Sequence, residues 1–154
     1  ENAMAEVEKY LSQARKEKAT VSRKKKILLV DDSELMLRAM QSLLDNDYEI
    51  ITAKSGMSAI RSITLGRPDL VLLDYEMPVC NGRQVLEMIR SEKEFRDTPV
   101  IFLTNMVDQE SVRKVIALKP EGYLLKTLPA EAVKKEVDRF FEKRCSGKKQ
   151  KKHD

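Results

Sequence analysis

The chain has 154 residues, of which 42% are hydrophobic and 35% charged, so its length and composition suit one water-soluble globular domain. Its net charge of +4 is unevenly spread: residues 1–26 carry +4, residues 143–154 carry +5, and residues 27–142 carry −5. An acidic core between basic ends argues against nucleic-acid binding by the core. No apolar run approaches the roughly 18–20 residues of a membrane span.

The cysteine and histidine content excludes several kinds of catalytic and metal site. Cys80 and Cys145 are far apart and lack the spacing of a zinc or redox motif, so we expect free thiols. His153 is the only histidine, which leaves no histidine triad and no histidine-rich metal site. The first residues are charged rather than apolar, so we expect no signal peptide and a cytoplasmic location.

Residues 1–23 predict a helix followed by a basic linker, outside the main domain. Within residues 4–19, which contain no glycine or proline, the apolar side chains recur at helical spacing: Val7, Tyr10, Leu11 and Ala14. An isolated helix with so short an apolar face would be marginal. Its role stays open among an adaptor element, a dimer-forming segment and the end of an upstream domain.

Residues 24–143 alternate short apolar runs with helical patterns. Strands are predicted at 27–30, 48–51, 70–73, 100–103 and 122–125, and helices at 35–44, 58–65, 84–89, 112–118 and 130–141. The first, third and fourth runs are apolar on both faces, which is typical of strands buried in a parallel sheet. The pattern predicts an α/β domain with a doubly wound, five-stranded parallel sheet in the flavodoxin-like order 2-1-3-4-5.

Polar side chains directly follow four of these strands. Asp31 and Asp32 follow the first strand, Asp74 the third, Thr104 the fourth and Lys126 the fifth. Each alone could be a turn or capping residue, but together they are expected at the edge of the sheet where such folds bind ligands. Crowded carboxylates raise the pKa of at least one of them and favour Mg²⁺, and a lysine and a hydroxyl suit an anion. The set therefore fits phosphoryl transfer to a carboxylate.

These residues lie in four segments: ILLVDDS at 27–33, LVLLDYEMPVCNG at 70–82, PVIFLT at 99–104 and GYLLK at 122–126. The segments resemble the receiver domain of two-component response regulators, of the chemotaxis-regulator type. The resemblance implies that Asp74 accepts a phosphoryl group from a phosphohistidine, carried by a sensor histidine kinase or a histidine phosphotransfer protein. It also implies a Mg²⁺ ion held by Asp32, Asp74 and the backbone carbonyl of Glu76, with Asp31 acting largely through a metal-bound water.

The resemblance further implies how the signal is passed on. Lys126 would pair with the phosphoryl oxygens, and Thr104 would hydrogen-bond one of them. Tyr123 would be the switch aromatic, turning into the space that Thr104 vacates. This movement would change the face formed by the helix at 112–118, the strand at 122–125 and the helix at 130–141. That face would contact an unidentified output protein or pair two copies in a homodimer, so we expect a signalling switch and not an enzyme.

Some positions depart from the family pattern, and others affect how long the phosphoryl group survives. Thr127 stands where a proline in a cis peptide usually follows the lysine, which leaves the Lys126–Thr127 bond open as cis or trans. Asn105 stands where a small residue is usual, and its bulk is expected to narrow access to the acceptor. Glu76 and Met106 occupy positions that, in this family, tune how long the phosphoryl group survives.

Alternative functions stay open on the sequence alone. The chain could be a docking scaffold that works without phosphorylation, or a fragment of a longer regulator. A Mg²⁺-dependent phosphohydrolase would need a second aspartate where Ser33 stands. Nucleic-acid binding through the basic ends would be nonspecific, and residues 144–154 are expected to form a basic tail without regular structure.

Overall fold

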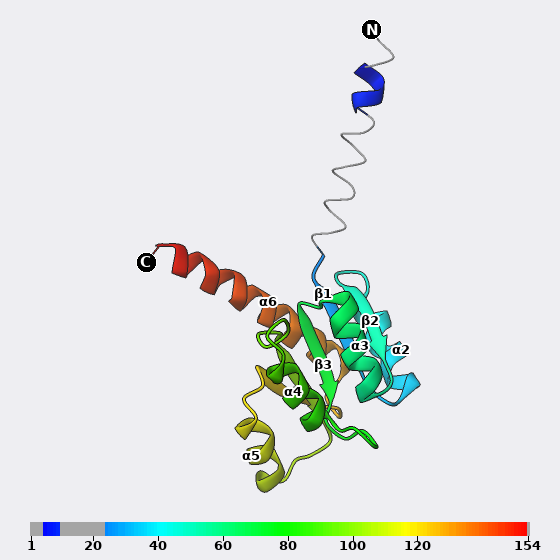
Figure 1. Cartoon of the computed structure of the whole chain (residues 1–154), viewed down its shortest axis with the longest axis vertical. Coiled ribbons are helices and arrows are strands. Elements are labelled where there is room, and N and C mark those ends of the chain that lie inside the picture. The colour runs from blue at the N-terminus through cyan, green and yellow to red at the C-terminus, as the bar shows by residue number, and fades with distance from the viewer. Residues whose placement is uncertain (1–4, 10–23, 154) are drawn as a thin grey trace.

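Strands and helices alternate along the chain in the order expected from the sequence (Figure 1). The structure, a computed structural model, describes residues 5–9 and 24–153, with side chains up to residue 144. Residues 5–9 are helical, and the rest of the helix predicted at 4–19 lies outside the described residues. The other elements are β1 (Lys26–Val30), α2 (Glu34–Leu44), β2 (Glu49–Ala53), α3 (Gly56–Gly66), β3 (Leu70–Asp74), α4 (Gly82–Ser91), β4 (Val100–Thr104), α5 (Gln109–Ala117), β5 (Gly122–Leu125) and α6 (Ala130–His153).

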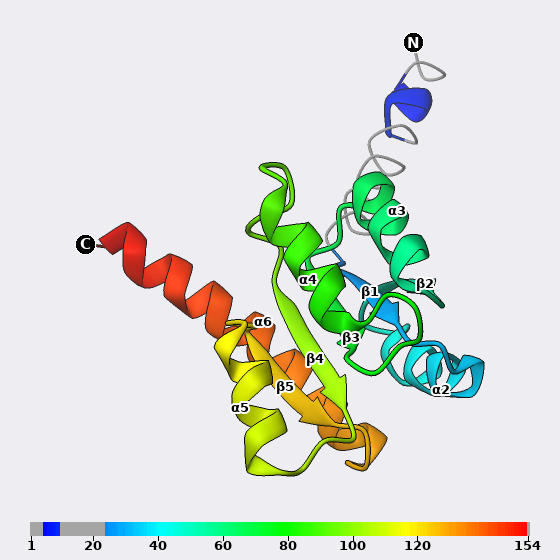
Figure 2. The same ribbon diagram turned by 60° about the horizontal axis from the view of Figure 1, so that its bottom comes forward.

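The five strands form one parallel sheet in the order β2-β1-β3-β4-β5, which confirms the predicted flavodoxin-like topology. In the register, Val30 at the end of β1 pairs with Ala53 of β2 and with Leu73 of β3. Thr104 at the end of β4 pairs with Leu125 of β5. The carboxyl ends of the strands therefore meet at one edge of the sheet (Figure 2).

Two apolar layers hold the sheet between its helices. On one face, α3, α4 and α5 pack against strand residues that include Val30 and Leu73. On the other face, α2 and α6 pack against Leu29 and Leu72, which directly precede Val30 and Leu73 in the chain. Because successive strand residues face opposite sides, the central strands have to be apolar throughout, as the sequence pattern indicated.

The helices begin at the carboxyl edge of the sheet with polar capping residues. Ser33, Ser55 and Asp108 each accept a hydrogen bond from the backbone N–H three residues further on. Asn81 forms a reciprocal capping box with Gln84. These caps fix the helix starts, so α2 to α5 begin one to three residues before their predicted first residues.

Two further elements also differ from their predicted bounds. β2 is Glu49–Ala53 rather than 48–51, because the Tyr48 N–H donates back to the Leu44 carbonyl and the pairing with the first strand begins with the Glu49 N–H, which donates to the Lys25 carbonyl. Helix α6 runs to His153, although residues 144–154 were expected to lack regular structure. The first turns of α6 are fixed by packing on the sheet, and a helix that has started extends readily through lysine, arginine and glutamine.

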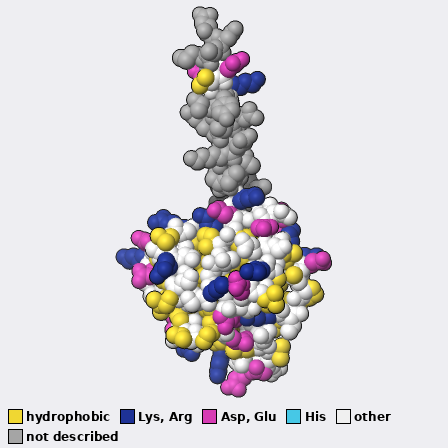
Figure 3. All heavy atoms as spheres, turned by 90° about the vertical axis from the view of Figure 1, so that its right-hand side faces the viewer, with side chains coloured by type: hydrophobic (Ala, Val, Ile, Leu, Met, Phe, Trp, Pro, Cys, Tyr) yellow, Lys and Arg dark blue, Asp and Glu magenta, His cyan; other side chains and the backbone are white. Residues whose placement is uncertain are grey.

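The surface of the domain carries charges of both signs. Figure 3 shows basic and acidic side chains intermixed on one face, with apolar side chains scattered among them. In the described part of the chain, no helix combines the length and the apolar character needed to cross a membrane. Cys80 is a free thiol, as predicted, and the Cys145 side chain lies outside the described residues.

Gly82, at the start of α4, has no room for a side chain. A Cβ there would meet the backbone of Asp74 and Tyr75 at 2.7 Å. We expect Gly82→Ala to lower the free energy of unfolding by about 2 kcal/mol, because a contact with backbone atoms forces a displacement. A Cβ at Gly122 would meet only Ile101, at 3.9 Å, so Gly122→Ala is the matched control. Urea unfolding curves measure the difference, and equal midpoints for the two variants would contradict it.

Candidate functional site

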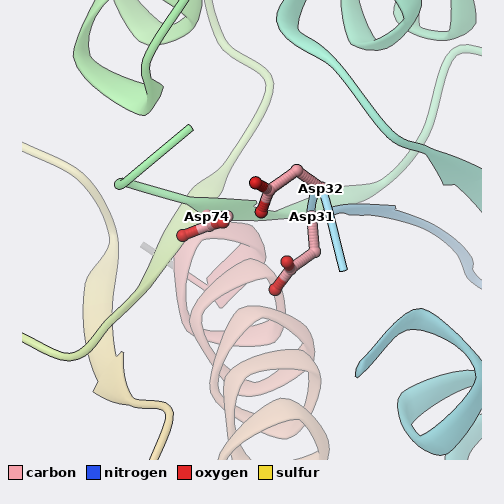
Figure 4. A group of neighbouring side chains, drawn as sticks. All are labelled: Asp31, Asp32 and Asp74. Atoms are coloured by element: carbon pink, nitrogen blue, oxygen red, sulfur yellow. The ribbon is translucent and has the colours of Figure 1, made fainter. Parts of the chain in front are cut away.

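The polar side chains predicted at the strand ends meet at the carboxyl edge of the sheet. Asp74 and Thr104 are the last residues of β3 and β4, and Asp31 and Lys126 directly follow β1 and β5. Asp74, Asp31 and Thr104 are buried, with exposed fractions of 0%, 2% and 1%, whereas Asp32 is exposed. Figure 4 shows the three aspartates gathered at the ends of β1 and β3.

Backbone turns fix the two buried carboxylates. Asp31 Oδ1 accepts the Ser33 N–H at 2.9 Å, and Asp74 Oδ1 accepts the Glu76 N–H at 3.0 Å. Aspartate suits this position because its short side chain reaches the backbone two residues further on. Each carboxylate is thus held from one side by its strand and from the other by the turn that leaves the strand.

Lys126 reaches the cluster from the edge strand. Its Nζ lies 2.8 Å from Asp74 Oδ1 and 3.2 Å from Asp31 Oδ2. The Lys126 N–H donates to the Thr104 carbonyl at 2.8 Å, so the pairing of β4 with β5 continues past the strand and directs the lysine inward. The described residues contain no cis peptide bond, so the Lys126–Thr127 bond is trans. The missing proline therefore does not turn the lysine away from the carboxylates.

Burial governs the charge states at the centre of the site. Desolvation raises the pKa of Asp74 to about 6, although hydrogen bonds from Lys126 and from the Glu76 N–H act in the opposite direction, and the charge of Asp31 adds to the rise. Burial also disfavours charged Lys126, but its hydrogen bond to Asp74 and the charges of both aspartates outweigh this, so the pKa of Lys126 lies above its ordinary value. The predicted rise of one carboxylate pKa thus occurs at Asp74, with burial as its largest cause.

The acidic cluster fits a hard divalent cation. One carboxylate oxygen from each of Asp31, Asp32 and Asp74 lies within 4.8 Å of the others. Asp74 Oδ2 is buried and accepts no hydrogen bond, and Asp31 Oδ2 has only the Lys126 ammonium beside it at 3.2 Å, which leaves both carboxylates incompletely satisfied. An ion that prefers oxygen ligands, such as Mg²⁺, would satisfy both atoms. The backbone carbonyl of Glu76 as a further ligand stays a prediction.

The Glu76 side chain contacts Thr104 and Asn105 and not the acidic cluster. The Thr104 hydroxyl donates to Glu76 Oε1 at 2.7 Å, and the Asn105 N–H donates to the same oxygen at 2.7 Å. The Met106 N–H donates to Thr104 Oγ1 at 3.1 Å. The sequence motifs indicate that Glu76 and Met106 affect the lifetime of the phosphoryl group, but they do not predict this contact. The contact could be anticipated only from the register of β3 and β4. Glu76 and Asn105 each lie two residues beyond the last pair of these strands, so the register brings them to the same level.

Tyr123 stands apart from the cluster on the edge strand. It pairs with Phe102 in the register, and 36% of its surface is exposed. Together with Leu124 and Phe140, it lines a pocket between β5 and α6. Tyr123 therefore lies on the face expected to carry the output, and its turning stays a prediction.

A doubly wound sheet with buried aspartates and a lysine at its carboxyl edge defines an α/β domain of the receiver type. Residues 27–138 match the response regulator receiver domain family, so the chain belongs to that family. The match spans all of the candidate site residues from Asp31 to Lys126. The resemblance found in the sequence motifs is thereby confirmed.

Relatives and solved structures agree with this assignment. The chain is 30% identical over 130 residues to chemotaxis protein CheY-3 of Vibrio cholerae, covering 81% of this chain and 98% of that protein. It is similar to the phosphorylated cyanobacterial phytochrome response regulator RcpA, with 29% identity, a TM-score of 0.66, and coverage of 77% of this chain and 92% of RcpA. It is also similar to the Mn²⁺-bound response regulator Rcp1, with 31% identity, a TM-score of 0.62, and coverage of 73% of this chain and 88% of Rcp1.

The burial of Asp74 makes stability depend on pH. Its folded-state pKa of about 6 lies above the ordinary value of 3.8, so ionised Asp74 lowers the stability of the fold as pH rises between these values. Without divalent cations, we expect Asp74→Asn to raise the free energy of unfolding at neutral pH by about 2 kcal/mol. The gain should shrink towards zero near pH 4.

Thermal unfolding of the wild type and Asp74→Asn, measured across this pH range in the presence of a chelator, checks the expectation. Asp97→Asn removes an exposed carboxylate and is the matched control. A gain at Asp74→Asn that does not change with pH would contradict the assigned cause.

Proposed function

We propose that the chain is a phospho-accepting switch of a two-component phosphorelay, with Asp74 as the acceptor. The observation that carries the proposal is the environment of Asp74. Its side chain is fully buried at the sheet edge, Lys126 Nζ lies 2.8 Å from Oδ1, and Oδ2 accepts no hydrogen bond. A carboxylate held in place through one oxygen, with the other free of hydrogen bonds, is suited to act as a nucleophile.

The phosphoryl donor in this proposal is a phosphohistidine on a sensor histidine kinase or a histidine phosphotransfer protein. A carboxylate oxygen of Asp74 forms the new O–P bond as the N–P bond breaks, and the imidazole nitrogen keeps the bonding electron pair. The ammonium of Lys126 would stabilise the charge on the phosphoryl oxygens, and so would the hydroxyl of Thr104 once it no longer donates to Glu76. The similarity to RcpA, which was solved in a phosphorylated form, supports this reaction.

Mg²⁺ is the cofactor in this proposal. Asp31, Asp32 and Asp74 would hold it, and it would supply positive charge against the phosphoryl oxygens. The buried Asp74 Oδ2, which accepts no hydrogen bond, supports this, as does the Mn²⁺-bound form of Rcp1. Lys126 contributes a second positive charge from the protein itself.

The output surface in this proposal is the face of α5, β5 and α6. Tyr123 of β5 and Ile116 of α5 leave 36% and 54% of their surfaces exposed, so both can be covered by an output protein or a second copy of the chain. Thr104 and Tyr123 lie on adjacent strands, which allows a change at the site to reach this face. Because the phosphoryl group stays on the chain, the protein acts as a switch and does not turn over a separate substrate.

Phosphorylation by a small donor tests the proposal. We expect incubation with acetyl phosphate and Mg²⁺ to add one phosphoryl group to the wild type and none to Asp74→Asn, as measured by intact-protein mass spectrometry. Asp97→Asn, an exposed position away from the sheet edge that holds the site, should accept the group like the wild type. If the wild type stays unmodified and Asp74→Asn keeps every partner interaction, the scaffold function is favoured instead.

Mg²⁺ affinity tests the metal assignment separately. Asp32 is exposed, so Asp32→Asn removes a carboxylate from the cluster without leaving a buried cavity. We expect this variant to bind Mg²⁺ at least about tenfold more weakly than the wild type, because losing groups of a metal site commonly costs that much affinity. Isothermal titration calorimetry measures the dissociation constants. Equal constants for the two proteins would remove Asp32 from the ligand set.

A further inference from the structure

Glu76 places its carboxylate where an anionic ligand of the site would find its hydrogen-bond donors. Its Oε1 accepts the Thr104 hydroxyl and the Asn105 N–H, both at 2.7 Å. Thr104 ends β4 beside β3, which ends in Asp74, so both donors lie next to the proposed acceptor. A hydroxyl and an N–H that converge on one oxygen form an oxyanion-binding pair.

The hydrogen bonds between the Glu76 carboxylate and this pair can break without disturbing the fold. Glu76 is exposed, whereas Thr104 has only 1% of its surface exposed, so the carboxylate covers a buried hydroxyl from the solvent side. The Glu76 N–H is bound separately to Asp74 Oδ1 at 3.0 Å. The side chain can therefore leave while its backbone stays anchored, and no core contact has to break.

The two donors cannot serve Glu76 and a second anion at the same time. A hydroxyl has one proton and a backbone N–H has one, so each donates one full hydrogen bond. The Met106 N–H donates to Thr104 Oγ1 at 3.1 Å, which occupies an acceptor position of that oxygen and leaves its proton directed at Glu76. Binding of Glu76 and binding of an oxyanion at this pair are therefore mutually exclusive.

We propose that Glu76 is an internal anion that closes the Thr104–Asn105 oxyanion subsite in the resting chain, and that a phosphoryl group occupies this subsite only after Glu76 has left it. The inference rests on the proposed function, since it concerns the same site. It adds competition between a residue of the chain and the incoming group. The apparent affinity for an oxyanion is then reduced by the fraction of chains in which the subsite is open.

Titration with beryllium fluoride in the presence of Mg²⁺ tests the competition, because this probe mimics a phosphoryl group on a carboxylate. By isothermal titration calorimetry, we expect Glu76→Ala to bind it about tenfold more tightly than the wild type, since two charge-assisted hydrogen bonds no longer have to be broken. Glu76→Gln keeps an oxygen that can accept both hydrogen bonds, so its gain should be clearly smaller. Glu94→Gln removes an exposed carboxylate between α4 and β4, at the opposite edge of the sheet, and should match the wild type.

A second measurement reads the resting contact without any ligand. The amide proton resonance of Asn105 should move upfield in Glu76→Ala and stay in place in Glu94→Gln, because only the first variant loses the acceptor. No upfield movement in Glu76→Ala, no gain in its affinity over the wild type, or an equal gain in Glu76→Gln would each overturn the inference. If the wild type and all variants fail to bind the probe, the proposed function itself is contradicted.

Discussion

The burial of Asp74 beside Asp31, with Lys126 as their cationic partner, is the constraint on which the site depends. Loss of hydration and mutual repulsion both disfavour two carboxylates in this position. The lysine compensates for only part of this, because it contacts one oxygen of each aspartate and Asp74 Oδ2 accepts no hydrogen bond. The apolar layers on both faces of the sheet hold these groups in place nonetheless. The result is a buried site whose negative charge is not fully balanced, and cation binding and phosphoryl transfer both require such a site.

The sheet register supplies the geometry that this constraint needs. Lys126 is directed inward by the hydrogen bond from its own N–H to the Thr104 carbonyl, and this bond continues the pairing of the two strands. The lysine therefore reaches Asp74 across a trans peptide bond with Thr127 in place of the usual proline. Ser33 caps α2 at the position where a phosphohydrolase would need its second aspartate, so that alternative finds no support in the site.

Much of this arrangement could be predicted from the sequence, because strands that are apolar on both faces have to be central and their carboxyl ends meet at one edge. Asp31, Asp74 and Lys126 follow from that rule. The Glu76 contact does not, since it depends on the rotamer of an exposed side chain between two loops and on the register of two strands far apart in the chain. The length of α6 does not follow from the sequence either, because a run of charged residues is typical of a solvated tail and also continues a helix whose first turns are packed.

The Glu76 contact also affects the outer surface of the domain. In the resting chain its carboxylate is bonded inward, but once displaced it becomes an unpaired acid on the β3–α4 loop, close in the chain to the fully exposed Val79. Val79 has a φ of 67°, which is unfavourable for a β-branched residue, so this loop is already strained. The domain would thus show two electrostatic surfaces, one for each state. A partner that prefers the displaced acid would strengthen oxyanion binding by a certain factor. By thermodynamic reciprocity, the oxyanion would strengthen binding of that partner by the same factor.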